Sequence, residues 1–216
     1  MGRTNWSLVV GLRSVEPMTN DPRPATELVA ASFAGLLSGV PVATARAGNV
    51  IGGGDWAEDR LIPDIWRAMT SGETLRLRHP EATRPWQHVL EPLSGYLTLA
   101  QHLWAEGAAF AEGWNLGPRD EDARPVQWIV ERLAEKWGRG ARWQLDGGNH
   151  PHEAHYLKLD ISKARSRLGW QPAWRLGQAL DHIVDWHEAW LDKQDVRALC
   201  LHHIARYTND SENIES

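Results

Sequence analysis

Three short segments of the chain carry side chains that can bind an anionic ligand or do chemistry. The first, residues 46–56, reads RAGNVIGGGDW and holds one side-chain amide, Asn49, among small residues. Ligands of open α/β sheets bind beyond the carboxyl ends of the strands, where an amide can contact them. A tight turn that needs glycines for positive φ, with Arg46 paired to a carboxylate, explains the same residues equally well.

The second segment, residues 83–89, reads TRPWQHV. Arg84 is a planar, permanently charged fork that suits a diphosphate group. The prolines nearby stiffen the loop that we predict over residues 80–85. From composition alone, an ordinary surface arginine is the plainer interpretation.

The third segment, residues 149–156, reads NHPHEAHY. The imidazoles of His150, His152 and His155 and the carboxylate of Glu153 are possible metal ligands. Pro151 breaks any regular spacing and no further ligand is identifiable, so we predict no metal site here. A polar pocket lined by His and Tyr, or a surface turn, remains open.

Several classes of function are excluded or disfavoured. The chain has no G-x-G-x-x-G, no nucleotide P-loop, no serine-hydrolase elbow and no H-E-x-x-H zinc helix, so it does not bind NAD in the usual way alone. A net charge of −5 gives no global positive field for a nucleic acid or an anionic membrane. A single cysteine, Cys200, allows no internal disulfide and fits the cytoplasm. No membrane span or signal peptide is recognisable, and we predict a cytoplasmic protein.

The elements that must position these segments alternate between helix and strand, which is typical of an α/β fold. We predict helices over residues 25–38, 60–70, 91–106, 126–137 and 176–193, and strands over 40–50, 74–78 and 142–146. Residues 157–170 predict a short strand and a short helix capped by Ser162. Residues 209–216 predict a frayed polar tail.

Tryptophan is unusually common, with 13 residues against 3 Tyr and 2 Phe. Six lie in helical patterns and are predicted to be core residues: Trp66, Trp104, Trp128, Trp137, Trp186 and Trp190. Trp56, Trp86 and Trp114 are predicted in loops, where an aromatic face can stack on a base or a sugar.

Five segments together resemble one family. They are RAGNVIGGGDWAEDRLIPDI (46–65), RPWQHVLEPLSGYL (84–97), EGWNLGPRDEDA (112–123), HPHEAHYLKLD (150–160) and LGWQPAW (168–174). In order and spacing they resemble the C-terminal part of an extended short-chain dehydrogenase/reductase of the NAD-dependent epimerase/dehydratase type, most closely the CDP-glucose 4,6-dehydratase family. The resemblance covers nearly everything from Ala25 to about Trp190.

The resemblance implies an α/β fold made of the last parallel strands of a Rossmann-type sheet and a small mixed α/β substrate-binding domain. The N-terminal dinucleotide-binding half is expected to be missing. The resemblance divides the chain into four segments. They are a degenerate remnant (1–24), a remnant of the Rossmann domain (25–56), a nucleotide-sugar-binding domain (57–195), and a C-terminal helix and tail (196–216).

The resemblance also implies residue roles. Asn49 and Arg84 would contact the diphosphate of a nucleotide sugar, and the stretch from Arg60 through Leu61 would meet its nucleotide part. His155 and Tyr156 would face the same ligand, whereas Arg46 and Ala47 would lie on the cofactor side. In such enzymes, which are lyases of polysaccharide biosynthesis, NAD takes hydride from C4 of the sugar, water is eliminated across C5 and C6, and hydride returns to C6.

One departure from the family pattern is decisive. The Tyr-x-x-x-Lys pair should precede the predicted helix at Ala25, yet the chain reads Asp-Pro-Arg-Pro over residues 21–24, and Arg23 is at best a stand-in for the lysine. Tyr96, Tyr156 and Tyr207 each lack a lysine four residues later. Without an acidified phenol there is no general base for oxidising the C4 hydroxyl.

We therefore expect a truncated chain without catalytic residues, inactive alone, that binds at most CDP-glucose. NAD is expected only in full-length relatives. Two alternatives remain: a non-catalytic binding or regulatory module that docks on an intact dehydratase subunit or forms a homo-oligomer, and a metal-binding domain built on the three histidines of residues 150–155. Neither a nucleic acid nor a membrane is an expected partner.

Overall fold

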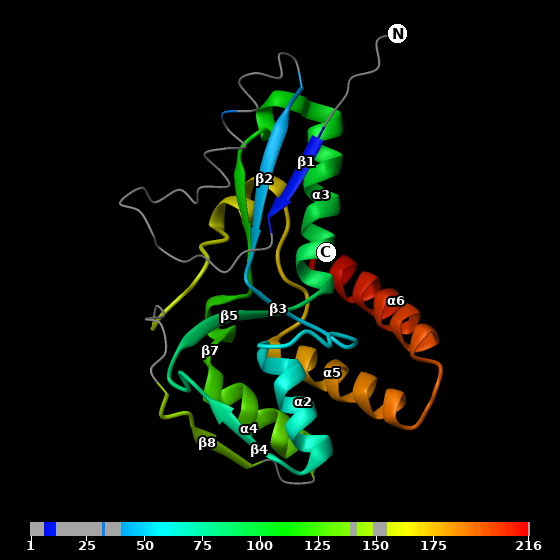
Figure 1. Cartoon of the computed structure of the whole chain (residues 1–216). Coiled ribbons are helices and arrows are strands. Elements are labelled where there is room, and N and C mark those ends of the chain that lie inside the picture. Colours follow the sequence, from blue (N-terminus) through cyan, green and yellow to red (C-terminus); the bar gives the residue numbers. More distant parts are fainter. Residues whose placement is uncertain (1–6, 12–31, 33–39, 139–141, 149–154, 216) are drawn as a thin grey trace.

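Figure 1 shows the computed structural model, which describes most of the chain. It describes residues 7–11, 32, 40–138, 142–148 and 155–215. The helix predicted over 25–38 lies almost wholly outside the described residues, as do His150 and His152, so these expectations stay predictions.

A parallel sheet forms one part of the molecule. Its strand order is β1-β2-β6, with β1 (Ser7–Gly11), β2 (Val42–Ala47) and β6 (Gly113–Leu116). The helix α3 (Leu90–Glu106) runs along these strands in Figure 1 and packs its buried side on them. Gly95 allows this approach, because a Cβ added there would lie 2.7 Å from Leu116 Cδ1.

A second sheet begins directly after β2 in the sequence. Its order is β3-β5-β7, with β3 (Asn49–Ile51) parallel to β5 (Thr83–His88), and β7 (Ala123–Pro125) antiparallel to β5. The continuous strand predicted over 40–50 is wrong, because it divides at Gly48. A Cβ on Gly48 would lie 2.3 Å from the Pro85 carbonyl oxygen, so the crossing between the sheets needs glycine.

The loop predicted over residues 80–85 is also wrong at its C-terminal end. The strand β5 begins at Thr83, and its first three residues pair with β7 in the register Thr83 to Pro125, Arg84 to Arg124 and Pro85 to Ala123. Proline normally marks a strand edge because it donates no ladder hydrogen bond. The partner strand lies about 40 residues downstream, so the local sequence gives no sign of the pairing.

The second core lies between three helices and the mixed sheet. The helices are α2 (Leu61–Ser71), α4 (Val126–Trp137) and α5 (Leu176–Leu191), and the parallel pair β4 (Thr74–Leu77) and β8 (Arg142–Leu145) closes one side. The predicted bounds of α4 are confirmed, and α2 ends at Gly72, whose φ of 74° suits glycine. No described helix is long and apolar enough to cross a membrane.

The C-terminal segment is helical rather than frayed. The helix α6 spans Val196–Glu215 and includes almost all of the predicted polar tail. Tyr207 anchors it, since its hydroxyl donates to Glu91 Oε2 at 2.7 Å, and Asp210 accepts a hydrogen bond from Trp174 Nε1 at 2.8 Å. The polar residues of this segment therefore mark the exposed side of a docked helix.

Residues 157–170 contain the predicted short helix, from residue 162 to residue 168, but not the predicted strand. A single bridge pairs Tyr156 with Thr83, in place of a strand, and Ala164–Leu168 form one π-helical turn, η3. Asp160 holds the start of this turn instead of Ser162, because Asp160 Oδ1 accepts the Ser162 N–H at 2.8 Å. Two 3₁₀ turns complete the set, η1 (Gly107–Phe110) and η2 (Asp120–Asp122).

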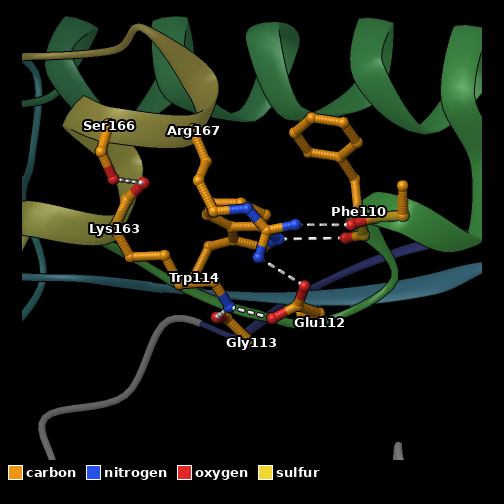
Figure 2. A network of polar contacts seen from close by, with 8 residues as sticks. Phe110, Glu112, Gly113, Trp114, Lys163, Ser166 and Arg167 are labelled. Atoms are coloured by element: carbon orange, nitrogen blue, oxygen red, sulfur yellow. Dashed lines mark hydrogen bonds and ion pairs between the residues drawn. The ribbon is translucent and has the colours of Figure 1, made fainter.

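Figure 2 shows how the π-helical turn is held against β6. Lys163 Nζ and Arg167 Nη1 donate to the two oxygens of Glu112 at 2.5 and 2.6 Å. The same two cations lie 4.3 and 5.3 Å from the Trp114 ring centroid. We call Glu112, Trp114, Lys163 and Arg167 the Glu112 clamp.

Several tryptophans lie where the sequence did not place them. Trp86 and Trp114 are strand residues, 4% and 0% exposed, with their indole N–H groups bonded to the carbonyls of Arg124 and Phe110. Trp104 and Trp190 are 68% and 46% exposed, so their core assignment is wrong. Among the remaining helical tryptophans, Trp128 is half-buried. The others are buried: Trp66, Trp137 and Trp186.

Candidate functional site

Arg84 lies on β5 and is only 8% exposed, so it is not an ordinary surface arginine. Its Nη1 donates to the Thr83 carbonyl at 3.0 Å. Across the antiparallel pair its partner in register is Arg124 of β7, and paired residues project from the same face of a sheet. Like charges placed directly opposite each other repel, and a bound anion would relieve that repulsion.

Asn49 lies on the same face of this sheet as Arg84. It is the first residue of β3 and pairs with Trp86, which follows Arg84 by two positions on β5. Side chains two apart on a strand share a face. The side-chain amide of Asn49 and the guanidinium of Arg84 therefore project from one face, beside the crossing at Gly48.

His155 and Tyr156 lie next to Thr83, the residue before Arg84. The Thr83 N–H donates to the His155 carbonyl at 2.9 Å, and the Leu157 N–H donates to the Thr83 carbonyl at 3.1 Å. Tyr156 is 61% exposed, and Lys158 Nζ lies 5.5 Å from its ring centroid. The hydrogen bond that the Lys158 ammonium donates to the Tyr156 hydroxyl, followed by the charge of Asp120, raises the pKa of Lys158. The structure thus places Asn49 and Arg84 on one face of the sheet and the backbone of His155 and Tyr156 beside Thr83, and the predicted common site stays a prediction.

Arg60 and Leu61 lie farther along the chain, at the start of α2. Arg60 is exposed and forms an ion pair with Asp55 at 3.4 Å, and Leu61 packs against the helical core. Within the described residues, the contacts of Arg60 lead to the loop after β3 rather than to Arg84. Their predicted contact with the nucleotide stays a prediction.

Arg46 and Ala47 end the strand β2. They pair with Asn115 and Leu116 of β6, and both are half-buried. This position, at the carboxyl end of a parallel sheet, fits a ligand-facing edge. Their cofactor role stays a prediction.

The glycine run of residues 52–54 has a packing explanation. A Cβ on Gly53 would lie 2.2 Å from Trp186 Cγ, and one on Gly52 would lie 3.1 Å from Val89 Cγ1. Gly54 adopts a φ of 78°, which glycine tolerates. These glycines pack against α5 and against the residue before α3. They therefore fit the interpretation of residues 46–56 as a tight turn that needs glycines.

Trp56 is the one tryptophan predicted in a loop that the structure does leave partly exposed, at 45%. Its ring contacts α5, with centroid distances of 4.7 Å to Trp190 and 6.2 Å to Trp186. It therefore serves first as packing for the glycine loop.

A hollow of about 590 Å³ next to Lys158 was not found by sequence reasoning. It lies beyond the carboxyl end of β6 and is lined by residues of both charge signs, including Arg119, Arg165, Arg175, Asp120, Glu121 and Asp160. Lys158 lies 3.8 Å from Asp120, and Arg175 bonds to Asp122 at 2.8 Å. Its charges come from three distant segments without a common spacing, so no motif could have identified it.

The two buried tyrosines, Tyr96 and Tyr207, do not suit a general base. Burial raises the pKa of Tyr96, and burial, followed by the charge of Glu91, raises the pKa of Tyr207. A catalytic phenol needs a shift in the opposite direction. Of the three histidines considered as metal ligands, His155 is the only one described, and it is exposed.

The comparisons with known proteins agree with the sequence resemblance. The chain is 51% identical to CDP-glucose 4,6-dehydratase of Salmonella typhimurium, in an alignment that covers 94% of this chain and 60% of that protein. The chain thus spans about 60% of the length of this curated relative. No family model matches the chain.

The fold is that of known short-chain dehydrogenase/reductase dehydratases and epimerases. MoeE5, solved with UDP-glucose and NAD, has a TM-score of 0.73 at 22% identity, covering 86% of this chain and 66% of that one. The dTDP-glucose 4,6-dehydratase of Bacillus anthracis, solved with NAD, has a TM-score of 0.63 at 19% identity, covering 87% and 57%. The predicted α/β fold with parallel strands is confirmed.

Proposed function

Because this chain is homologous to CDP-glucose 4,6-dehydratase over 94% of its length, we propose that it is the nucleotide-sugar-binding part of such an enzyme and binds CDP-glucose. The buried Arg84, opposite Arg124 in the sheet, carries this proposal. A diphosphate is the anion whose paired charges match two guanidinium forks on one face.

The neighbouring residues have complementary roles. The amide of Asn49 donates to the diphosphate from β3, and Arg84 clamps it from β5. Tyr156 is exposed and bridges to Thr83, the residue before Arg84, and it offers a ring face and a hydroxyl to the nucleotide or the sugar. His155 adds a further polar group at the same edge, and the stretch from Arg60 to Leu61 meets the nucleotide from α2.

NAD does not fit the described residues. A dinucleotide cradle needs glycines that leave space for the pyrophosphate, whereas Val89 and Trp186 occupy the space next to Gly52 and Gly53. Where a relative holds NAD, the cofactor supplies the hydride acceptor. We propose that this chain alone binds no NAD and carries out no dehydration.

The binding proposal is tested by calorimetry with CDP-glucose on the purified chain. We expect saturable binding that Arg84→Met weakens by about tenfold or more, because a hydrogen bond to a charged group contributes about 1.5–3 kcal/mol. Arg76→Met, at an exposed position on β4, is the matched control and should leave the affinity unchanged. Absence of binding, or equal loss in both variants, would overturn the proposal.

A second function has its own support in the helix α3. Leu93 and Leu97 lie one helical turn apart on it and are 46% and 68% exposed. Among the described strands, β1 is paired on one side only. An apolar helix stripe and a parallel strand that is paired on one side only favour a module that docks on an intact dehydratase subunit.

Co-purification with the Salmonella relative tests this second function. We expect a complex that Leu97→Glu abolishes and that exposed Leu201→Glu, on α6, leaves intact. Absence of a complex for the unmodified chain would remove the docking function and leave CDP-glucose binding untouched. We propose a cytoplasmic location for the chain.

A further inference from the structure

The helices α5 and α6 bring three metal-ligating side chains together, far along the chain from Arg84. His182 and Asp185 lie three residues apart on α5 and share a face, and His203 comes from α6. One ligand atom of each residue lies within 4.8 Å of the other two. None of these residues belongs to the proposed nucleotide-sugar site.

Both imidazoles are withdrawn from solvent. His182 is 4% exposed and His203 is 6% exposed, with ring centroids 4.4 Å apart. The ring of His182 also lies 4.1 Å from that of Trp174, so the stack fixes its orientation. Within the described part of the chain, His182 Nδ1 is buried without a hydrogen-bond partner. A buried polar atom without a partner is costly and needs an explanation.

The local electrostatics suit a cation. Burial lowers the pKa of His203 to about 4 and lowers that of His182, so both are neutral at pH 7, the form that ligates metals. Asp185 contributes a carboxylate, and Asp181 and Asp210 add negative charge near His182. The nearby Arg206 lies 3.8 Å from the Asp210 carboxylate, which balances its charge.

We propose that His182, Asp185 and His203 bind a divalent transition-metal ion, with Zn²⁺ as the best match, and that the ion fastens α6 to α5. Two imidazole nitrogens and one carboxylate oxygen are ligands that Zn²⁺ accepts, with water in the fourth position. Asp185 is exposed, so ion and water enter from its side. The ligands converge from two helices, as in metal sites of helical bundles.

The test uses the full chain without an affinity tag, freed of metal by a chelator. Zn²⁺ affinity is measured by competition with a chromogenic chelator, and Co²⁺ binding by its visible absorption. We expect one equivalent of tightly bound metal, and a loss of affinity of about tenfold or more in His203→Gln. His202→Gln, the adjacent and exposed histidine of α6, is the matched control and should bind as the unmodified chain does.

Thermal unfolding provides a second measurement. Zn²⁺ should raise the midpoint of the unmodified chain and of His202→Gln but not that of His203→Gln. Asp185→Asn, at an exposed position, keeps the test valid if His203→Gln fails to fold, and it should also weaken binding. The proposal is overturned if no equivalent of Zn²⁺ binds, or if Asp185→Asn and His203→Gln both bind it undiminished, which would place the ion on other histidines.

Discussion

Glu91 is a carboxylate with almost no contact with solvent, at the start of α3. It is 1% exposed and accepts hydrogen bonds from the Tyr207 hydroxyl, the Trp174 N–H and the Ala173 N–H. Burial raises its pKa, while the three hydrogen bonds oppose the rise. One side chain therefore ties α3, the loop before α5, and α6 together.

The charge of Glu91 makes a testable difference to stability. Glu91→Gln cannot accept all three hydrogen bonds, and we expect it to lower the free energy of unfolding by about 1–3 kcal/mol near pH 4.5. A carboxyl whose folded pKa is raised contributes stability below its unfolded pKa and loses that contribution as pH rises. The deficit of the variant should therefore shrink from pH 4.5 upward, as measured by urea unfolding.

The control for this prediction is Glu73→Gln, at an exposed position between α2 and β4. Its effect should stay small and independent of pH. A deficit of Glu91→Gln that grows with rising pH would contradict the assigned direction of the pKa shift.

At the residue scale, the resemblance identified more than the physical pattern could. Composition favoured a surface position for Arg84, whereas its guanidinium chemistry and the family motif both indicated an anionic ligand; its burial accompanies pairing with β7, a contact between distant segments. Distant pairings also place Trp86 beside β3 and Trp114 beside β2, in strands where both are buried. Neighbouring Gly, Pro and Asn residues therefore predict a loop wrongly where the strand partner lies far away in the sequence.

At the element scale, the glycine loop and α5 act as one packed unit. Gly53→Ala would place a methyl group 2.2 Å from Trp186 Cγ, so the indole must move. We expect a loss of about 1–3 kcal/mol in the free energy of unfolding, typical of an overpacked core. Urea unfolding monitored by circular dichroism measures it.

Gly177→Ala is the matched control, because a Cβ at that position in α5 meets open space. Alanine is the better helix former there, so the control should be neutral or stabilising by up to about 1 kcal/mol. Equal losses in the two variants would show that the contact with Trp186 is not the cause.

The Glu112 clamp gives a prediction about salt. Its charged side chains are 36–42% exposed, and exposed ion pairs contribute little. Glu112→Gln should cost about 1 kcal/mol or less at low ionic strength, and the cost should fall in 1 M salt, where screening acts within about 3 Å. Unfolding in urea at two salt concentrations measures this change.

The control is Glu131→Gln on α4, whose carboxylate accepts from the neutral Gln127. Its effect should not depend on salt. The clamp lowers the pKa of Glu112 chiefly through the bond from Lys163, so its contribution is present above pH 4.5 and is lost as pH falls. A cost of Glu112→Gln that persists at acidic pH would contradict this origin.

Helices with one apolar face were largely predictable from the sequence. The bounds of α4 and the end of α2 at Gly72 follow from periodicity and helix-stop signals alone. The division of the strand at Gly48 and the helical form of residues 209–215 depend on Pro85 and on Glu91, which lie far away. Local patterns do not record such contacts.

At the scale of the whole molecule, the described residues form the parallel sheet β1-β2-β6 and the mixed sheet β3-β5-β7, whose core includes residues of α2, α4 and α5. Incubated with CDP-glucose and NAD, the chain should form no 4-keto-6-deoxy sugar, because no tyrosine of the sequence has a lysine four residues later and burial raises the pKa of Tyr96 and Tyr207. Product analysis by nuclear magnetic resonance, with the Salmonella relative as positive control, measures this. Calorimetry should register CDP-glucose but not NAD, and turnover by the chain alone would contradict the prediction.

The crowding of indoles around α5 has an optical consequence. The ring of Trp56 lies 4.7 and 6.2 Å from those of Trp190 and Trp186, and Trp66 lies 4.8 Å from Trp137. Excitation energy hops readily between identical fluorophores at such separations. Light emitted by the folded chain is therefore depolarised by energy migration, and its anisotropy reports the closeness of these rings more directly than its colour does.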